Sequence, residues 1–158
     1  MTRLAVAELE RRLAAALARR GLAAPAETAW AASWLCACAY PGLTILTEAL
    51  ADEVRAHPLS RDGLGLDLGH VSCVFLAPAI TEDVRNHGRV FLRNVRHGLF
   101  LLPFSVRDGL AIGCPVDPAF ALGGERSKDP YAEKLAHAQM AGIDVDEAAL
   151  SLLEAAGT

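Results

Sequence analysis

The chain has 158 residues, of which 53% are hydrophobic and 22% are charged, a composition typical of a globular protein and far from that of a disordered chain. This length is that of one domain with a hydrophobic core of its own. The formal net charge of −4 at pH 7 gives the chain no bias towards nucleic acid, so we predict no nucleic-acid partner.

The N-terminal residues predict an amphipathic helix rather than an export signal. Glu8 and Glu10 come before any apolar run has formed, which excludes the pattern of a signal peptide. Leu9 and Leu13 recur at helical spacing, while charged side chains occupy the other faces. We therefore predict a helix over Leu4–Arg20 and a protein of the bacterial cytoplasm.

Two further helices follow in the helical segment. Pro25 suits the first turn of a helix that we predict to run to about Ala39. A third helix is predicted over Leu43–Ala56, with His57-Pro58 ending it. The apolar stretch from Ala29 to Tyr40 is shorter than the roughly 20 residues that cross a bilayer, so no membrane association is expected.

The four cysteines are interpreted as buried thiols. Cys36 and Cys38 form a CxC pair, but residues two apart on a helix point about 200° away from each other. A metal or redox role for this pair is the alternative. Cys73 and Cys114 complete no metal-ligand spacing, so we predict no metal site.

The middle of the chain predicts a loop, a helix and a strand in that order. The strand pattern places Val90 and Leu92 on one face and Phe91 on the other. A glycine between helix and strand is typical of an α/β layer. The expected ranges are Leu59–Gly69 for the loop, His70 or Pro78 to His87 for the helix, and Arg89–Val95 for the strand.

The segment Leu99–Val106 is compatible with either a strand or a helix, because an apolar run of this length has no decisive period. Asp108-Gly109 favours a hairpin turn before Leu110. Pro103, in contrast, suits the first turn of a short helix. The choice stays open on the sequence alone.

The C-terminal third predicts an irregular stretch and two closing helices. The ranges are Pro115–Pro130 for the irregular stretch, and Pro130–Ala141 and Asp144–Ala156 for the helices, with Asp144 or Asp146 as the cap of the second. We expect a single α/β domain over residues 1–158, in which a helical segment (1–57) precedes a small sheet with packed helices (58–158).

Read in order, the chain resembles a shortened malate/L-lactate (sulfolactate-like) dehydrogenase. Those enzymes are NAD(P)-dependent 2-hydroxyacid oxidoreductases outside the Rossmann fold. The similar segments are the helices of Leu9–Leu50, Gly69-His70-Val71, Asn86-His87-Gly88, Arg93-Asn94-Val95-Arg96-His97-Gly98, Asp108-Gly109-Leu110 and Gly123-Gly124.

The chain also resembles an uncharacterised proteobacterial family, a domain of unknown function that opens with the same kind of helices. In that group the run around Leu99–Phe104 looks helical. A closing helix similar to Glu147-Ala148-Ala149-Leu150, ending near Ala156-Gly157, belongs to the same resemblance.

The dehydrogenase family carries a D-S-H-G signature whose histidine transfers a proton at the 2-hydroxyl. At the matching place this chain reads Cys38-Ala39-Tyr40-Pro41-Gly42-Leu43-Thr44, with no residue suited to acid/base work near neutral pH. The chain is also about half the family's length. The resemblance therefore implies a scaffold without the family's catalysis and without a bound cofactor.

The candidate ligand-binding residues lie beyond the predicted strand. Arg93, Asn94, Arg96 and His97 occur together in a turn, where polar side chains can converge on a small anion. His70 is added because it precedes a helix within the similar Gly-His-Val segment. We interpret His57 and His137 as surface residues and His87 as a residue that complements a helix end.

Two functions follow from these residues. The first is a non-catalytic, dehydrogenase-like domain that binds a small acid or a partner protein. The alternative is an oxidoreductase that uses NAD or NADP on a small 2-hydroxy acid, with His97 or His70 as the acid/base. The mean hydropathy of +0.27 predicts self-association, such as a homodimer, or a partner subunit.

Overall fold

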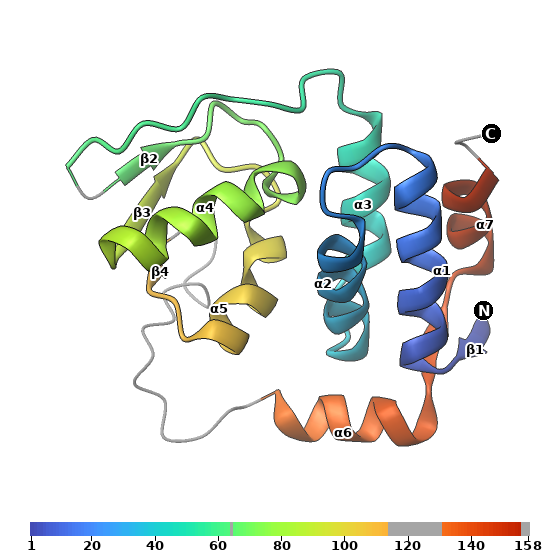
Figure 1. Cartoon of the computed structure of the whole chain (residues 1–158). Helices are drawn as coiled ribbons and strands as arrows, with labels where there is room; N and C mark the ends of the chain where they lie inside the picture. Colours follow the sequence, from blue (N-terminus) through green and yellow to red (C-terminus); the bar gives the residue numbers. More distant parts are fainter. Residues whose placement is uncertain (64, 114–130, 156–158) are drawn as a thin grey trace. The chain divides into compact units, whose positions relative to one another are not determined.

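The computed structural model describes residues 1–63, 65–113 and 131–155 (Figure 1). It forms two compact units, one of Met1–Glu48 with Asp129–Thr158 (unit 1) and one of Ala49–Lys128 (unit 2). The fold is α/β, with packed helices and small sheets, as the sequence predicts. Predictions on residues 114–130, including Cys114, the irregular stretch and Gly123-Gly124, lie outside the described residues.

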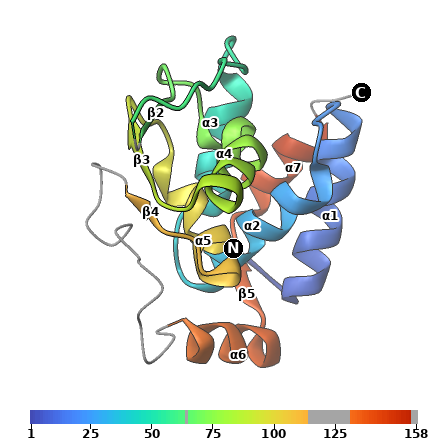
Figure 2. The same ribbon diagram turned by 60° about the vertical axis from the view of Figure 1, so that its left-hand side comes forward.

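Unit 1 is a helical layer closed by a two-stranded antiparallel sheet. Helix α1 packs against α2 and α7 (Figures 1 and 2). The two strands β1 and β5 join the beginning of the chain to its last part, in the register Thr2↔Val145 to Leu4↔Ile143. The elements are β1 (Thr2–Leu4), α1 (Val6–Arg19), α2 (Pro25–Ala37), most of α3 (Gly42–Ala51), α6 (Ala132–Ala141), β5 (Ile143–Val145) and α7 (Glu147–Ala155).

The helices of unit 1 form for the reasons that their sequences indicate. The predicted inward residues of α1, among them Leu9 and Leu13, are fully buried. Pro25 occupies the first turn of α2. The apolar face of α3 is buried as predicted, although the helix ends at Ala51 instead of Ala56. Arg55 donates from Nη2 to the Leu50 carbonyl at 2.7 Å and satisfies this earlier end.

The short strands of unit 1 differ from the sequence-based expectation. Residues 143–145 form β5, whereas we expected the second closing helix to begin at Asp144. Asp144 lies within that strand, so the cap of α7 is Asp146, which accepts from the backbone N–H of Ala148 at 3.0 Å. Three residues are too few to show a strand period, which explains why neither strand was predicted.

Unit 2 is a three-stranded parallel sheet with helices between its strands. The strand order is β2-β3-β4, and the inward residues Leu66, Val90, Leu92 and Ile112 are buried. The elements are β2 (Gly65–Asp67), α4 (Cys73–His87), β3 (Val90–Arg93), the 3₁₀ turn η1 (Gly98–Leu101), α5 (Leu102–Asp108) and β4 (Ile112–Gly113).

The structure decides the open choice at residues 99–106 in favour of a helix. The run forms η1 and α5, with Pro103 in the first turn of α5. The predicted hairpin at Asp108-Gly109 is wrong. Gly109 has φ +64° and ends α5, and the strand that follows pairs parallel with β3. A left-handed glycine serves a helix end as readily as a tight hairpin turn.

Two further expectations are corrected. The predicted loop of residues 59–69 contains β2. The C-terminal helices α6 and α7 belong to the unit formed by the first helices, whereas the sequence analysis grouped them with the α/β portion. Among the described residues, no helix combines the length and the apolar character needed to cross a membrane.

Candidate functional site

The predicted binding residues lie on and beyond the carboxyl ends of two neighbouring strands. Residues 68–72 follow β2 and residues 94–97 follow β3. Backbone N–H groups of Leu68, His70 and Cys73 donate to the carbonyls of residues 93, 94 and 96, each at 2.9 Å. Ligands of open α/β sheets bind outside the carboxyl ends of the strands, so this edge is where a site is expected.

The backbone of these two loops holds an unusual conformation. His70, Asn94 and His97 have φ values of +60°, +54° and +60°, and Gly69 has +57°. A positive φ is uncommon for residues other than glycine and persists only where the surroundings impose it. The two loops are therefore held rigidly by the hydrogen bonds between them.

Asp67, the last residue of β2, organises the nearer part of the edge. Its Oδ1 accepts from Asn94 Nδ2 and from the backbone N–H of Gly69, both at 2.9 Å. The hydrogen bond from Asn94, then that from Gly69, lowers the pKa of the Asp67 carboxyl. The amide of Asn94 is thus engaged within the protein.

His57 also belongs to this edge, which the sequence analysis did not predict. Its ring covers Gly69 so closely that a Cβ on residue 69 would lie 2.5 Å from His57 Cε1. The side chain is half-buried, rather than on the surface as we interpreted it. His70, in contrast, is exposed, and it precedes α4 without capping it.

Arg96 forms a bidentate ion pair with Asp52. Its Nε and Nη2 donate to the two carboxylate oxygens at 2.8 and 2.9 Å. The hydrogen bonds from Arg96 lower the pKa of Asp52. This guanidinium is therefore neutralised internally, and Asp52 could not be found from the sequence because 44 residues separate the pair.

His97 lies against the start of α4. Its Nδ1 is 2.7 Å from the Oγ of Ser72, the N-cap residue that accepts from the backbone N–H of Val74 at 3.2 Å. Because Ser72 is fully buried, its hydroxyl does not reach an external substrate. The pair fixes the loop to the helix, and the hydroxyl of Ser72 is better described as a cap than as a nucleophile.

Arg93 differs from Arg96 in its pairing. Its Nη2 lies 4.0 Å from Asp62 Oδ2, and 52% of the Arg93 side chain and 85% of the Asp62 side chain are exposed. An exposed ion pair at this distance contributes little energy. The charge of Arg93 also acts on Asp67, its neighbour in the register of the sheet. Its guanidinium nevertheless stays half-exposed, which leaves it accessible to an external anion.

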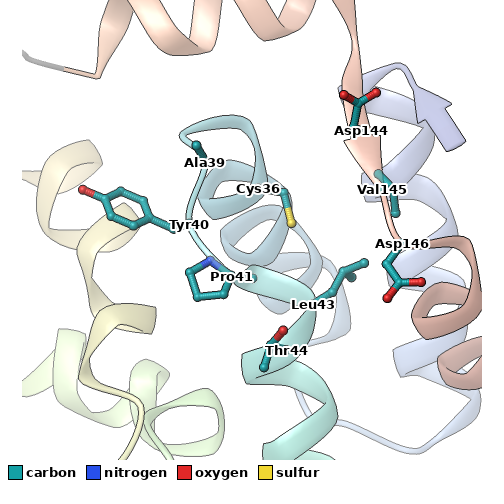
Figure 3. A pocket seen from close by; sticks show the side chains of 10 residues that line it. Cys36, Ala39, Tyr40, Pro41, Leu43, Thr44, Asp144, Val145 and Asp146 are labelled. Carbon is teal, nitrogen blue, oxygen red and sulfur yellow. The ribbon is translucent and has the colours of Figure 1, made fainter. Parts of the chain in front are cut away.

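A separate cavity of about 340 Å³ lies in unit 1 (Figure 3). Its wall includes Tyr40, Thr44 and neighbours from the segment where the dehydrogenase resemblance would place the catalytic histidine. The ionisable groups of the wall are two carboxylates, a thiol and the phenol of Tyr40, with no cation that would attract a small acid. The wall is formed by Cys36, Ala39, Tyr40, Pro41, Gly42, Leu43, Thr44, Asp144, Val145 and Asp146.

The thiols are consistent with a structural role. Cys38 and Cys73 are buried, as predicted, and Cys36 is half-buried at the cavity. Burial raises the pKa of the Cys36 thiol, and N–H groups of Leu43 and Gly42 partly offset this. Within residues 1–63, 65–113 and 131–155, no three histidine, cysteine or acidic side chains gather as metal ligands would.

Comparison of the chain with models of protein families, with curated proteins and with solved structures finds no match.

Proposed function

We propose that the carboxyl edge of the parallel sheet in unit 2 binds a small acid, without catalysing its conversion. The observation that carries the proposal is the exposed, loosely paired guanidinium of Arg93 beside two loops that backbone hydrogen bonds join. A guanidinium presents a planar fork of donors that matches a carboxylate. Loops fixed before binding lose little conformational entropy when a ligand arrives.

The neighbouring groups support a binding role over catalysis. Arg96 and Asn94 are engaged with Asp52 and Asp67, and His97 contacts the buried Ser72. These contacts shape the edge and leave Arg93 as its external cation. The segment Cys38–Thr44, where the dehydrogenase resemblance expects an acid/base, contains no histidine, which also supports a non-catalytic domain.

The proposal is tested by titrating the purified protein with DL-lactate and with acetate while recording amide chemical shifts. We expect the amides of residues 93–97 to move in a saturable way. Arg93→Gln is expected to weaken binding at least about tenfold, because it removes a charge-assisted contact. Arg89→Gln, at the other end of β3, is the matched control and should bind as the native chain does.

Two results would count against this proposal. Equal binding by Arg93→Gln and the native chain would remove Arg93 from the site. A thermal shift with NAD or NADP, together with turnover of a 2-hydroxy acid, would favour the oxidoreductase alternative. At 100 times Kd a ligand adds about 2.7 kcal/mol of stability, which such a screen detects readily.

We also propose that the protein self-associates or binds a partner subunit, and that it is located in the cytoplasm. The apolar composition that predicts a homodimer or a partner subunit is a property of the whole chain. Sedimentation at micromolar concentration distinguishes the outcomes, since a single species of 16.7 kDa would contradict a stable homodimer.

A further inference from the structure

Phe91 and Arg93 stand on the same face of β3. They are two residues apart, and side chains at this spacing point to one side of a strand. Val90 and Leu92, on the other side, are buried, whereas 47% of Phe91 and 52% of the Arg93 side chain are exposed. The outer face of the parallel sheet thus presents an aromatic ring and a cation together.

Two glycines make room for these side chains. In the register of the sheet, Gly65 of β2 and Gly113 of β4 lie on either side of Phe91. A Cβ on Gly113 would lie 2.6 Å from Phe91 Cδ1, and a Cβ on Gly65 would lie 3.1 Å from Arg93 Nη1. The ring therefore lies over one flanking strand, and the guanidinium lies over the other.

The size of this face favours a small molecule over a second copy of the chain. Strands about 4.8 Å apart and two to four residues long give a face of roughly 150 Å², whereas a stable dimer buries about 800 Å² on each partner. Parallel sheets nevertheless have both faces covered in most proteins. A ligand of modest size would fit the small area of this face and would also cover it.

We infer that the acid bound at Arg93 carries a planar aromatic ring that packs on Phe91, an inference that rests on the proposed function of the same edge. The ring and the guanidinium lie over strands on opposite sides of β3, about 10 Å apart. The ligand class is therefore an aromatic carboxylate whose acid group is separated from the ring by a short chain. Aromatic rings attract one another in offset or tilted arrangements, and the charge of Arg93 selects the carboxylate.

The experiment compares 4-phenylbutanoate with 4-cyclohexylbutanoate, which share the chain and the carboxylate and differ in the planarity of the ring. Each is titrated into the full-length protein and followed by amide chemical shifts of residues 91, 93 and 113. We expect 4-phenylbutanoate to bind about two- to tenfold more tightly, the range that aromatic pairing supplies beyond simple burial. Equal affinities would overturn the inference.

Variants separate this inference from the proposed function. Phe91→Leu should abolish the preference for the aromatic acid while both acids still bind. Phe91→Tyr, which retains an aromatic ring, should keep the preference. Arg93→Gln should weaken the binding of both acids. If neither acid binds the native chain while DL-lactate does, the inference fails and the proposed function stands, whereas the proposed function fails if none of these acids binds. If both acids bind but Phe91→Leu keeps the preference, only the inference fails. Because Phe91 is half-exposed, neither substitution at residue 91 is expected to prevent folding.

Discussion

The ion pair between Arg96 and Asp52 connects the loop after β3 to the residue that follows α3. Both donor distances are below 3.0 Å, and 23% of the Asp52 side chain is exposed. A partly exposed ion pair contributes measurably to the free energy of unfolding when its geometry is bidentate, as it is here. The pair holds Arg96 in place, and residues 94–97 with it.

We predict that Asp52→Asn lowers the free energy of unfolding by about 0.5–1 kcal/mol at pH 7, as measured by urea denaturation. Because the pKa of Asp52 is lowered in the folded protein, its contribution is complete above the ordinary carboxyl pKa. The contribution is then lost as the pH falls through the lowered value. The difference between variant and native chain should therefore disappear on acidification.

Glu53→Gln is the matched control, since Glu53 is the exposed neighbour of Asp52. It should unfold as the native chain does at pH 7. A difference for Asp52→Asn that persisted unchanged on acidification would show that the carboxylate charge is not its source.

The start of α4 depends on one buried hydroxyl. Ser72 Oγ accepts from the N–H of Val74 and contacts Nδ1 of His97. The first turn of a helix has N–H groups without partners in the helix itself. Ser72 satisfies one of them and ties the helix to the neighbouring loop.

We predict that Ser72→Ala destabilises unit 2 by about 1–2 kcal/mol, the cost of losing a well-formed cap. The amide of Val74 should exchange with solvent faster, as measured by hydrogen exchange. Ser60→Ala removes an exposed hydroxyl and is expected to leave that exchange unchanged. If both variants exchanged equally, the cap would have no energetic role.

The elements that the sequence predicts are those whose pattern is local. Helix α1 repeats an apolar face over its whole length, and Pro25 indicates the start of α2. The strands β1, β2 and β5 have three residues each and gain their partners only through distant segments, so no local period identifies them. The wrong hairpin at Asp108-Gly109 has the same origin, because one dipeptide fits two structures.

For the candidate site, too, the local sequence indicates only a part of the structure. A turn after a strand, with arginines and a histidine, is visible in residues 93–97 of the sequence. The partners that decide which of those side chains remain open, Asp52, Asp67 and Ser72, come from other elements. The engagement of Arg96 and Asn94 therefore cannot be predicted from residues 93–97 alone.

The first and last parts of the chain form one unit. Arg12 of α1 pairs with Glu154 and, at 3.3 Å, with Glu147 of α7. The hydrogen bonds from Arg12 lower the pKa of Glu154. Together with the pairing of β1 and β5, these contacts explain why unit 1 combines segments that a division of the sequence at residue 57 separates.

Helix α7 closes unit 1 through buried leucines. Leu150 is fully buried, whereas 63% of Leu152, two residues on in the same helix, is exposed. We predict that Leu150→Ala lowers the free energy of unfolding by about 2–5 kcal/mol, while Leu152→Ala changes it little. Both tryptophans, Trp30 and Trp34, lie in α2 of unit 1, so the tryptophan fluorescence of the denaturation reports this unit. Similar unfolding midpoints for the two variants would mean that α7 contributes nothing to the core built on α1 and α2.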